Sequence, residues 1–493
     1  MAIPRLEWAA EWLEHIKENY IGGAWHEASG APFQLVNPAT GSPLATLCLS
    51  TTTDANAAVQ AARGAFNGAA QQLKRRDRAR ILQTIARLIR DRAEELATLE
   101  TLANGKLFQE SLEDIPECAD VCEYYAGWVD KHYGETAPVE AGFLNYTVHE
   151  PVGVCALIVP WNFPLLLAMW KIAPALAMGN TVVVKPSEYT PLSLIRLVQL
   201  IHEQLDLPPG LLNLVIGDGV AGAVLAGHPN VDKVSFTGST VVGREVVKQA
   251  AASNLKTVSL ELGGKSPNIL FADAPDLEAT IARSFTSMFS HKGEKCSEPT
   301  RILVQRPIYD RVVAALAERA NAVKCGDPFA ASSEQGPQCN QRQLDKILSY
   351  IAAGRSDGAR LVAGGERDVT GTNCAGFFVR PTVFADVDHR ISIAQEEIFG
   401  PVLVAIPFTD EDEAITIANS TPYGLAAGVY TSDVSRAHRM ARRLDAGMVF
   451  INHYGCYDFA SPFGGFRQSG WGKEMARQSL EAYTKTKSVW VKI

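Results

Sequence analysis

The feature that most constrains the fold is a regular alternation of apolar and amphipathic segments between residues 150 and 264. Strands that are apolar on both faces and alternate with helices form a parallel sheet covered by helices on both sides. The sequence therefore predicts a doubly wound α/β fold, whose ligand binds beyond the carboxyl ends of the strands. The predicted strands are residues 154–159, 181–184, 212–216, 233–236 and 257–261, and the predicted helices are 167–178, 192–204, 220–226 and 240–251.

Further segments flank this region, as expected for a chain of 493 residues, which should form two or three domains. The first 130 or so residues are predominantly helical in pattern, with one long amphipathic stretch over residues 54–103. A second α/β block runs from residue 264 to about residue 462, with strands at 301–304 and 402–406. Residues 133–150 and 484–493 have detached strand patterns, and such strands usually pair with another element or subunit.

Charge and hydropathy exclude two classes of partner. The formal net charge is −8, whereas nucleic acids and anionic membranes both attract concentrated positive charge. Residues 151–170 carry no charged side chain and are long enough to span a bilayer. Pro160 and Pro164 would break such a helix, and Asn162 would lie at its centre. We interpret this segment as a buried strand, a turn and a helix, and we expect neither a nucleic-acid nor a membrane partner.

The cysteines and the N-terminus indicate the compartment. Nine cysteines are scattered along the chain without a C-x-x-C pair, which predicts neither a disulfide framework nor a zinc site. A reducing compartment, the cytoplasm, fits this usage. Residues 1–14 have neither the basic start nor the apolar core of a secretory signal.

Cys296 is the strongest candidate for covalent chemistry. It lies in the run 289–297 (FSHKGEKCS), whose polar side chains favour a reactive thiolate, whereas most cysteines are structural. Glu261, 35 residues earlier, places one carboxylate at the end of an apolar strand pattern. A nucleophilic thiol with a buried general base is the minimum required for catalysis through a thioester. The alternative for Glu261 is an ion pair with a nearby lysine such as Lys265.

Polar turns follow three of the predicted strands, and two of these turns contain glycine. The run 217–222 (GDGVAG) fits either contact with a dinucleotide or a plain strand-to-helix turn. The run 236–243 (FTGSTVVG) opens a helix, so free backbone N–H groups and the Ser239 hydroxyl can bind a diphosphate. Lys185 and Glu188 end another strand, where they either hold an adenosine ribose or form a solvated turn.

Taken together, these segments make the chain similar to the NAD(P)-dependent aldehyde dehydrogenase superfamily, in its hydrolytic, non-CoA-acylating form, over nearly the whole length. The resemblance implies a Rossmann-like cofactor domain at residues 1–132 and 152–263, a catalytic α/β domain at 264–468, and small β oligomerisation strands at 133–151 and 484–493. The matching segments are 20–25 (YIGGAW), 36–41 (VNPATG), 160–164 (PWNFP), 185–188 (KPSE), 236–240 (FTGST), 261–265 (ELGGK), 396–401 (EEIFGP) and 461–465 (SPFGG).

The resemblance implies a role for each catalytic residue. The Cys296 thiolate attacks the aldehyde carbonyl, and the Asn162 amide with the Cys296 backbone N–H forms the oxyanion hole. Losing one such donor typically costs roughly 3–4 kcal/mol of barrier. Glu261 activates the water that hydrolyses the thioester. Lys171 and Glu474 match positions on a proton route.

The resemblance also implies the cofactor contacts. Lys185 and Glu188 match the adenosine-ribose pair, and Ser239 matches the diphosphate contact. Glu188 can accept hydrogen bonds from both ribose hydroxyls and would repel a 2′-phosphate, so NAD is expected in preference to NADP. Use of both cofactors stays open. The remaining cofactor positions are Trp161, Ser187, Gly217, Phe236, Gly238, Gly263, Glu397 at the nicotinamide ribose and Phe399 beside the nicotinamide ring.

The residues that flank the nucleophile depart from the common family pattern, Gly-Gln-x-Cys. Glu294 and Lys295 stand there instead, and Lys295 either steers an acidic aldehyde or, as we favour, pairs with Glu294. The other tunnel positions are mainly aromatic and include no arginine, which predicts an aromatic or medium-chain aliphatic aldehyde. By resemblance the tunnel residues are Phe163, Leu167, Trp170, Lys295, Ser297, Gly455, Cys456, Tyr457 and Phe463.

Alternative functions differ in substrate or in the second half-reaction. One is a semialdehyde dehydrogenase for an acidic substrate, and another is a CoA-acylating enzyme, which commonly lacks a glutamate at the Glu261 position. A non-catalytic binding protein is disfavoured because Cys296, Glu261 and Asn162 occur together. The family's assembly implies a homodimer or homotetramer, and no metal is expected.

Overall fold

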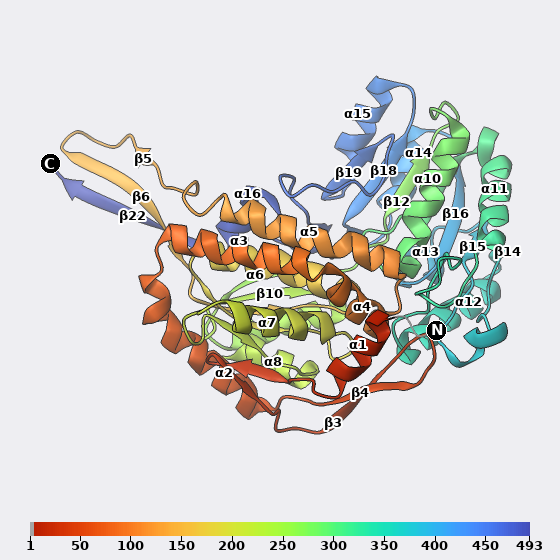
Figure 1. The fold of residues 1–493 in the computed structure, drawn as a ribbon. Helices are drawn as coiled ribbons and strands as arrows, with labels where there is room; N and C mark the ends of the chain where they lie inside the picture. The colour runs from red at the N-terminus through yellow and green to blue at the C-terminus, as the bar shows by residue number, and fades with distance from the viewer. Residues whose placement is uncertain (1–3) are drawn as a thin grey trace.

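The computed structural model describes residues 4–493, which form two α/β domains and a projecting β arm (Figure 1). Residues 1–3, the start of the predicted cofactor domain and of the N-terminal stretch, lie outside the described residues. The arm carries the C-terminus at its tip, away from both domains (Figure 1).

The predicted parallel sheet forms the centre of an eight-stranded sheet. Its five parallel strands follow the order β9-β8-β7-β10-β11, so all five predicted strands are confirmed. Strand β9 ends at Leu214 rather than at Ile216, because the Ile216 N–H donates to the Asn19 side chain instead. The bounds are β7 Val154–Ile158, β8 Thr181–Lys185, β9 Leu212–Leu214, β10 Lys233–Thr237 and β11 Thr257–Glu261.

Helices cover both faces of this sheet (Figure 1). Apolar residues of α3, α5, α6 and α7 pack on one face, and those of α2, α8 and α9 pack on the other. The predicted single amphipathic pattern over residues 54–103 is wrong in one respect: it forms α2, α3 and α4, because the backbone leaves helical geometry near Leu73 and at Arg92. The bounds are α2 Thr52–Phe66, α3 Arg75–Asp91, α4 Ala93–Asn104, α5 Phe108–Ala126, α6 Pro164–Ala177, α7 Leu192–Gln204, α8 Gly219–Gly227 and α9 Thr240–Ala252.

The N-terminal region contains strands as well as helices. After α1 (Pro4–Leu13), the short strands β1 (Asn19–Ile21) and β2 (Ala24–His26) extend one edge of the sheet. Strands β3 (Pro32–Val36) and β4 (Pro43–Cys48) form a separate antiparallel pair. The prediction of a mostly helical start misses these strands, because runs of three to six residues give too little periodicity to identify.

The second domain is built on a seven-stranded sheet with the order β14-β15-β16-β13-β12-β18-β19. All adjacent pairs are parallel except β14 with β15. The predicted strands at 301–304 and 402–406 are confirmed as β13 and β16. The strands are β12 Pro267–Leu270, β13 Arg301–Gln305, β14 Arg360–Ala363, β15 Thr382–Ala385, β16 Val402–Phe408, β18 Ala426–Tyr430 and β19 Met448–Ile451; the helices are α10 Leu277–Phe289, α11 Tyr309–Ala322, α12 Gln341–Ser356, α13 Ser392–Gln395, α14 Glu411–Ala418 and α15 Val434–Arg443.

One late segment of the chain returns to the first sheet. Strand β21 (Gly470–Trp471) pairs antiparallel with β11, so that Gly470 lies opposite Glu261. The short pair β17 (Tyr423–Gly424) and β20 (Phe466–Arg467) precedes it, and α16 (Ala476–Ala482) follows it. Residues 463–474 therefore lie beside the end of β11, which carries the candidate general base.

The detached strands pair with each other. Strands β22 (Thr484–Lys492), β6 (Phe143–Pro151) and β5 (Thr136–Ala137) form a three-stranded antiparallel sheet in that order. The register runs from Thr484 opposite Pro151 to Lys492 opposite Phe143. This sheet is the projecting arm of Figure 1.

Residues 151–170 have the predicted strand, turn and helix, as β7, a turn and the start of α6. No helix in the described part of the chain is both long and apolar enough to cross a bilayer. All nine cysteines are free thiols.

Candidate active site

Cys296 follows helix α10 at the end of a tightly turned loop, here called the nucleophile loop (residues 289–297). His291, Lys292 and Gly293 have φ angles of 49°, 63° and 71°, the left-handed region that costs about 1–2 kcal/mol for each non-glycine residue. The Cys296 side chain is half-buried. Burial raises the pKa of its thiol, as do the carboxylates of Glu261 and Glu397, whereas its own backbone N–H lowers it. That N–H therefore lies close enough to the sulfur to stabilise negative charge beside it.

Asn162 lies in the turn between β7 and α6 and is only 6% exposed. Its amide Nδ2 donates to the backbone carbonyl of Glu294 at 2.8 Å, which ties the turn to the nucleophile loop. An amide nitrogen has two N–H donors, so one remains for a ligand. Asn162 and the Cys296 N–H can therefore stabilise an oxyanion next to the cysteine.

Glu261 ends β11 with its carboxylate buried at 4% exposure. Burial raises its pKa well above the usual value, and nearby Glu474 raises it further, while Lys171 and Lys473 oppose this. Its Oε2 has no hydrogen-bond partner in the described chain. The alternative ion pair with Lys265 is wrong, since no such pair occurs within residues 4–493 and Lys265 Nζ itself lacks a hydrogen-bond partner there. Glu261 is thus a buried, strongly basic carboxylate close enough to Cys296 to perturb its pKa.

Lys171 and Glu474 form a buried ion pair beneath Glu261. Lys171 comes from α6, and Glu474 comes from the segment that follows β21. Lys171 Nζ also donates to the Thr237 hydroxyl at 2.7 Å, and the Ser235 hydroxyl donates to Glu474 at 3.3 Å. The arrangement can accept or supply a proton next to the Glu261 carboxylate.

The residues predicted to contact a dinucleotide lie at the carboxyl ends of β8, β9 and β10. Lys185 Nζ lies 3.9 Å from the Glu188 carboxylate and donates to the carbonyls of Pro186 and Gly217. Ser187 is buried in the same turn. The Gly217 turn of the sequence analysis thus lies beside the Lys185–Glu188 pair.

Helix α9 begins at the second glycine-bearing turn. Ser239 is its N-cap and accepts from the Val242 N–H at 3.3 Å. A Cβ on Gly238 would lie 2.5 Å from the Phe236 ring, so the turn is close-packed. Val220, Val241 and Val242 at the starts of α8 and α9 are 59%, 70% and 48% exposed. Exposed valines can cover the apolar face of a base. The helix N-terminus beside them can bind a diphosphate through its free N–H groups.

Glu397, which matches the nicotinamide-ribose position, lies close to the nucleophile, since its carboxylate raises the pKa of Cys296. Glu397 accepts from the Gly264 N–H at 3.0 Å, and a Cβ on Gly263 would lie 2.3 Å from its carboxylate. The Phe399 ring meets the Trp161 ring edge-on, with centroids 5.3 Å apart. Only glycine fits at residue 263, because any side chain would displace Glu397.

Aromatic side chains gather on the other side of Cys296. Trp170 packs edge-on against Phe463 at 5.1 Å, and Phe463 lies 5.7 Å from Tyr457. The Ser297 and Tyr457 hydroxyls are 2.6 Å apart. Phe163 stands outside this trio and packs on the His291 ring at 4.8 Å. Leu167 is buried on α6, whereas Gly455 and Cys456 are exposed.

Lys295 does not pair with Glu294, so that prediction is wrong. Its Nζ donates to the Ser290 hydroxyl at 2.6 Å and lies 3.3 Å from the Glu298 carboxylate. Glu294 is paired with Lys292 instead, at 2.8 Å. The left-handed turn at residues 291–293 reverses the direction of neighbouring side chains, and sequence adjacency does not reveal this.

Sequence reasoning also misses an acidic row on α5 that contacts the nucleophile loop. Glu110 Oε1 accepts from the His291 N–H at 2.6 Å, and the Asp114 carboxylate lies 3.3 Å from His291 Nε2. Buried Lys106 donates to Asp114 at 2.5 Å and to Glu100 at 2.6 Å. The signal was the i, i+4 spacing of Glu110 and Asp114, which places both carboxylates on one helix face.

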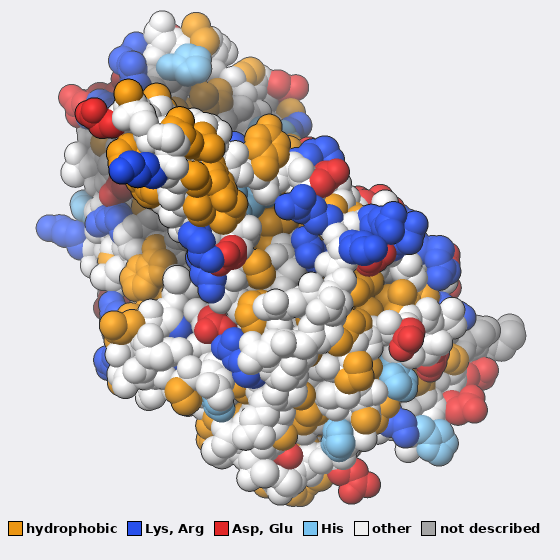
Figure 2. Space-filling model, turned by 90° about the vertical axis from the view of Figure 1, so that its left-hand side faces the viewer, with side chains coloured by type: hydrophobic (Ala, Val, Ile, Leu, Met, Phe, Trp, Pro, Cys, Tyr) orange, Lys and Arg blue, Asp and Glu red, His pale blue; other side chains and the backbone are white. Residues whose placement is uncertain are grey.

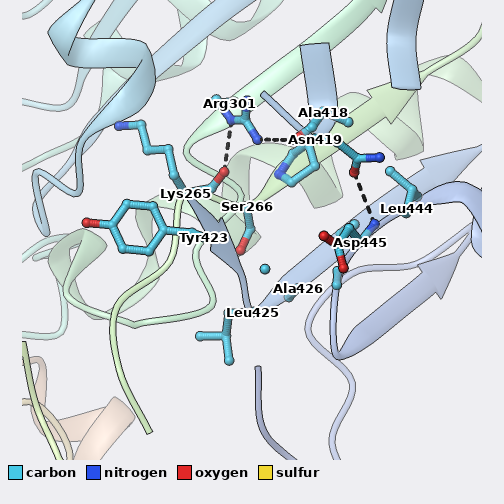
Figure 3. Close-up of a pocket in the computed structure, with 14 residues that line it drawn as sticks. Lys265, Ser266, Arg301, Ala418, Asn419, Tyr423, Leu425, Ala426, Leu444 and Asp445 are labelled. Atoms are coloured by element: carbon cyan, nitrogen blue, oxygen red, sulfur yellow. Dashed lines mark hydrogen bonds between the residues drawn. The ribbon is translucent and has the colours of Figure 1, made fainter. Parts of the chain in front are cut away.

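The pocket drawn in Figure 3 is distinct from this site. It lies where β12 and β18 begin, and its lining includes Lys265, Ser266 and Arg301 but neither Cys296 nor Glu261. Buried Arg301 donates to the carbonyls of Lys265, Ile417 and Ala418 at 2.7–2.8 Å. Its hydrogen bonds join strands and loops, so the pocket is a structural junction. The Lys265 amine points away from Arg301 (Figure 3).

Comparison with known proteins places this arrangement in a family. Residues 25–489 match the model of the aldehyde dehydrogenase family. An aldehyde dehydrogenase of Aspergillus niger is 47% identical over 463 residues, which cover 94% of this chain and 92% of that protein. The NAD+ complex of an aldehyde dehydrogenase from Bacillus cereus has a TM-score of 0.96 and 44% identity, covering 100% of this chain and 99% of that chain. A variant of P. syringae indole-3-acetaldehyde dehydrogenase, solved with NAD+ and IAA, has a TM-score of 0.96 and 43% identity, with 100% of both chains covered.

Proposed function

The chain belongs to the aldehyde dehydrogenase family and is an NAD-dependent aldehyde oxidoreductase; we propose that it oxidises an aromatic or medium-chain aliphatic aldehyde and releases the acid by hydrolysis. The observation that carries this proposal is Glu261, a buried carboxylate that raises the pKa of Cys296 and has one oxygen without a hydrogen-bond partner among residues 4–493. A base in this position can act on an acyl group attached to the sulfur.

The first half-reaction forms and oxidises an adduct on Cys296. The sulfur attacks the aldehyde carbon, and the carbonyl oxygen takes the negative charge of the thiohemiacetal. Asn162 Nδ2 and the Cys296 N–H stabilise that charge, each donor being worth roughly 3–4 kcal/mol. The thiol must lose its proton to solvent or to a base as the sulfur attacks, because burial raises the pKa of Cys296.

The second half-reaction hydrolyses the thioester. Glu261 removes a proton from water as the oxygen attacks the acyl carbon, and the Cys296 thiolate leaves. The buried Lys171–Glu474 pair beside Glu261 then relays the proton away from the site. A CoA-acylating reaction would need no such base, so the environment of Glu261 favours hydrolysis over that alternative.

The residues at these strand ends fit NAD. Lys185 and Glu188 would hold the adenosine ribose, Ser239 and the start of α9 would hold the diphosphate, and Glu397 would hold the nicotinamide ribose; the Lys185–Glu188 contact, the Ser239 cap and the Glu397 hydrogen bond support these roles. When bound, NAD accepts the hydride from the carbon that Cys296 has attacked. We expect NAD in preference to NADP, because the Glu188 carboxylate would repel a 2′-phosphate.

The substrate class follows from the trio of Trp170, Tyr457 and Phe463. Their rings form an apolar wall suited to an aromatic or alkyl group. The P. syringae relative, an indole-3-acetaldehyde dehydrogenase, is named for an aromatic aldehyde, which supports the same class. Lys295 is held by Glu298, so its charge is already compensated and an acidic semialdehyde is the weaker candidate.

We also propose that the protein acts in the cytoplasm as a homodimer or homotetramer assembled through the arm. Figure 2 looks onto the side from which the arm projects and shows hydrophobic side chains gathered in its upper part. An exposed apolar patch on a short sheet is typical of a subunit interface. The exposed hydrophobic residues of the arm are Phe143, Leu144, Tyr146, Trp490, Val491 and Ile493.

The test measures cofactor reduction by its absorbance with a panel of aldehydes: benzaldehyde, phenylacetaldehyde, hexanal and succinic semialdehyde. Each is assayed with NAD and NADP, with and without CoA, and with Cys296→Ala as the control. We expect NAD-dependent turnover without CoA, greatest for the aromatic or hexyl substrates and absent in the variant. Turnover only with CoA would exclude Glu261 as the deacylating base, and preference for the semialdehyde would exclude the apolar substrate class.

A further inference from the structure

The nucleophile loop contains a buried ion pair that the reaction does not use. The Lys292 and Glu294 side chains are each only 1% exposed, and Lys292 Nζ lies 2.8 Å from Glu294 Oε2. A fully desolvated ion pair contributes little net stability against apolar side chains, so its presence calls for another explanation.

The ion pair is part of a closed ring of contacts around Asn162. On one side, Lys292 Nζ donates to the backbone oxygen and to Oδ1 of Asn104, both at 2.8 Å. Asn104 Nδ2 in turn donates to the carbonyl of Trp161 at 2.8 Å. On the other side, the Glu294 carbonyl accepts from Asn162 Nδ2 at 2.8 Å. The ring therefore holds both the residue before Asn162 and the Asn162 amide itself.

Further contacts hold the loop in its left-handed turn. The Glu294 carboxylate accepts from the Cys339 N–H at 3.2 Å, and Gln338 Nε2 donates to the Lys292 carbonyl at 3.4 Å. A Cβ on Gly293 would lie 2.5 Å from the carbonyl of Gly400, so the turn packs tightly against the backbone that precedes β16. Because His291 and Lys292 would not adopt φ near +50° to +60° unaided, these side-chain anchors determine where the Glu294 carbonyl lies.

We propose that Lys292 and Glu294 are positioning residues, whose buried ion pair fixes the Glu294 carbonyl and thereby aims the free N–H of Asn162 at the oxygen of the Cys296 adduct. Neither side chain touches substrate; both act through Asn162. The inference rests on the proposed role of Asn162 as an oxyanion donor. It assigns a reason to the Glu294 departure from the common family pattern, since the glutamate has its cationic partner two residues earlier.

The two charges are required together. Removing one partner leaves the other buried and uncompensated, and a charge in that position will move toward water or another partner and displace the loop. Replacing both by neutral amides removes the uncompensated charge and keeps hydrogen-bonding groups of similar size. Single and double substitutions should therefore have opposite outcomes, which additive damage cannot produce.

The experiment measures the pre-steady-state burst of NADH, which reports formation and oxidation of the adduct, in Lys292→Gln, Glu294→Gln and the double variant. We expect each single variant to slow the burst by about tenfold or more, and the double variant to recover to within about threefold of the unmodified protein. NAD binding and thermal unfolding are measured on the same samples. The control is the exposed pair Arg311→Gln and Glu278→Gln, whose charges lie 2.7 Å apart on the surface and should show no coupling.

A second cycle tests whether the effect passes through Asn162. In an Asn162→Ala background, Glu294→Gln should change the burst by less than about threefold, because the donor that it aims is absent. Asn104→Ala, which breaks the ring without leaving a buried charge, should slow the burst in the presence of Asn162 only. A burst unaffected by the single substitutions, or slowed equally with and without Asn162, would overturn the inference.

The burst precedes the choice between water and CoA as acyl acceptor. A result in which acid appears only with CoA would therefore refute the proposed hydrolysis and leave this test intact. Conversely, normal hydrolysis with a burst that ignores Lys292 and Glu294 would refute the positioning role alone.

Discussion

Replacing Glu261 by glutamine removes the proposed base and leaves its surroundings unchanged. Glutamine has nearly the same volume, and Glu261 has no ion-pair partner within residues 4–493 that would be left unpaired. Burial raises the pKa of Glu261, so the carboxylate is costly to ionise and a neutral amide should not destabilise the fold. We therefore expect the free energy of unfolding to change by less than about 1 kcal/mol.

The effect on catalysis should be large and confined to one step. A positioned general base contributes roughly 10²–10⁴-fold, or about 2.7–5.4 kcal/mol of barrier, to the step that it assists. If that step is hydrolysis, Glu261→Gln will still form the thioester and will then stop. Rapid mixing with excess aldehyde and NAD should show about one NADH per site in a burst, followed by turnover reduced about a hundredfold or more.

The acyl group can be observed directly. Protein quenched after the burst should have gained the mass of one acyl group on Cys296, and Cys296→Ala should show neither burst nor added mass. Steady-state turnover within about threefold of the unmodified protein would refute the role of Glu261 in hydrolysis. Loss of the burst together with turnover would instead place Glu261 in the first half-reaction, as the base that deprotonates the thiol.

Three other perturbations have defined outcomes. Gly464→Ala places a Cβ 2.5 Å from Glu261 Oε1, so stopped-flow assays should show slow turnover with a preserved burst. Burial and Arg301 lower the pKa of Lys265 to about 7. The buried charge of Lys265 therefore destabilises the fold fully below pH 7, and this destabilisation is relieved as the pH rises toward 10.5. Lys265→Met should raise the unfolding temperature more at pH 6.5 than at pH 9, and equal increases at the two pH values would contradict this. Burial would raise the pKa of Asp114, but Lys106 and His291 lower it to about 2. The ionised Asp114 carboxylate therefore stabilises the fold above about pH 4, and this stabilisation is lost as the pH falls toward 2. In urea unfolding, Asp114→Asn should show about 2 kcal/mol less stability at pH 7 and should lack the acid-dependent loss.

The parts of the fold that could be predicted are the elements whose local hydrophobic pattern identifies them. Strands β7, β8, β10 and β11 lie within one residue of the predicted bounds, since a strand buried on both faces must be apolar throughout. Helix α7 matches its prediction at both ends. Strand β21, only two residues long, could not be predicted, because its place beside β11 depends on an antiparallel pairing more than 200 residues away.

The site divides in the same way. Cys296 and Glu261 could be identified from the sequence, because the neighbours of each indicate a chemical role. The partners of Lys295 and Glu294 were not, because the left-handed turn at residues 291–293 directs their side chains to Glu298 and Lys292. Ion pairs depend on side-chain direction, which neighbouring positions in a strained loop do not share.

By itself the sequence determined the architecture and the chemical inventory: a doubly wound sheet, a second α/β domain, a pair of detached strands, one thiol, and one carboxylate at a strand end. The hydrophobic periodicity and the order of the motifs can both be read from the linear sequence without the tertiary structure. Only the tertiary structure decided which groups meet. It placed Glu474 under Glu261, paired the two detached strands with each other, and closed the contacts around Asn162, because each of these contacts joins segments that are distant in sequence.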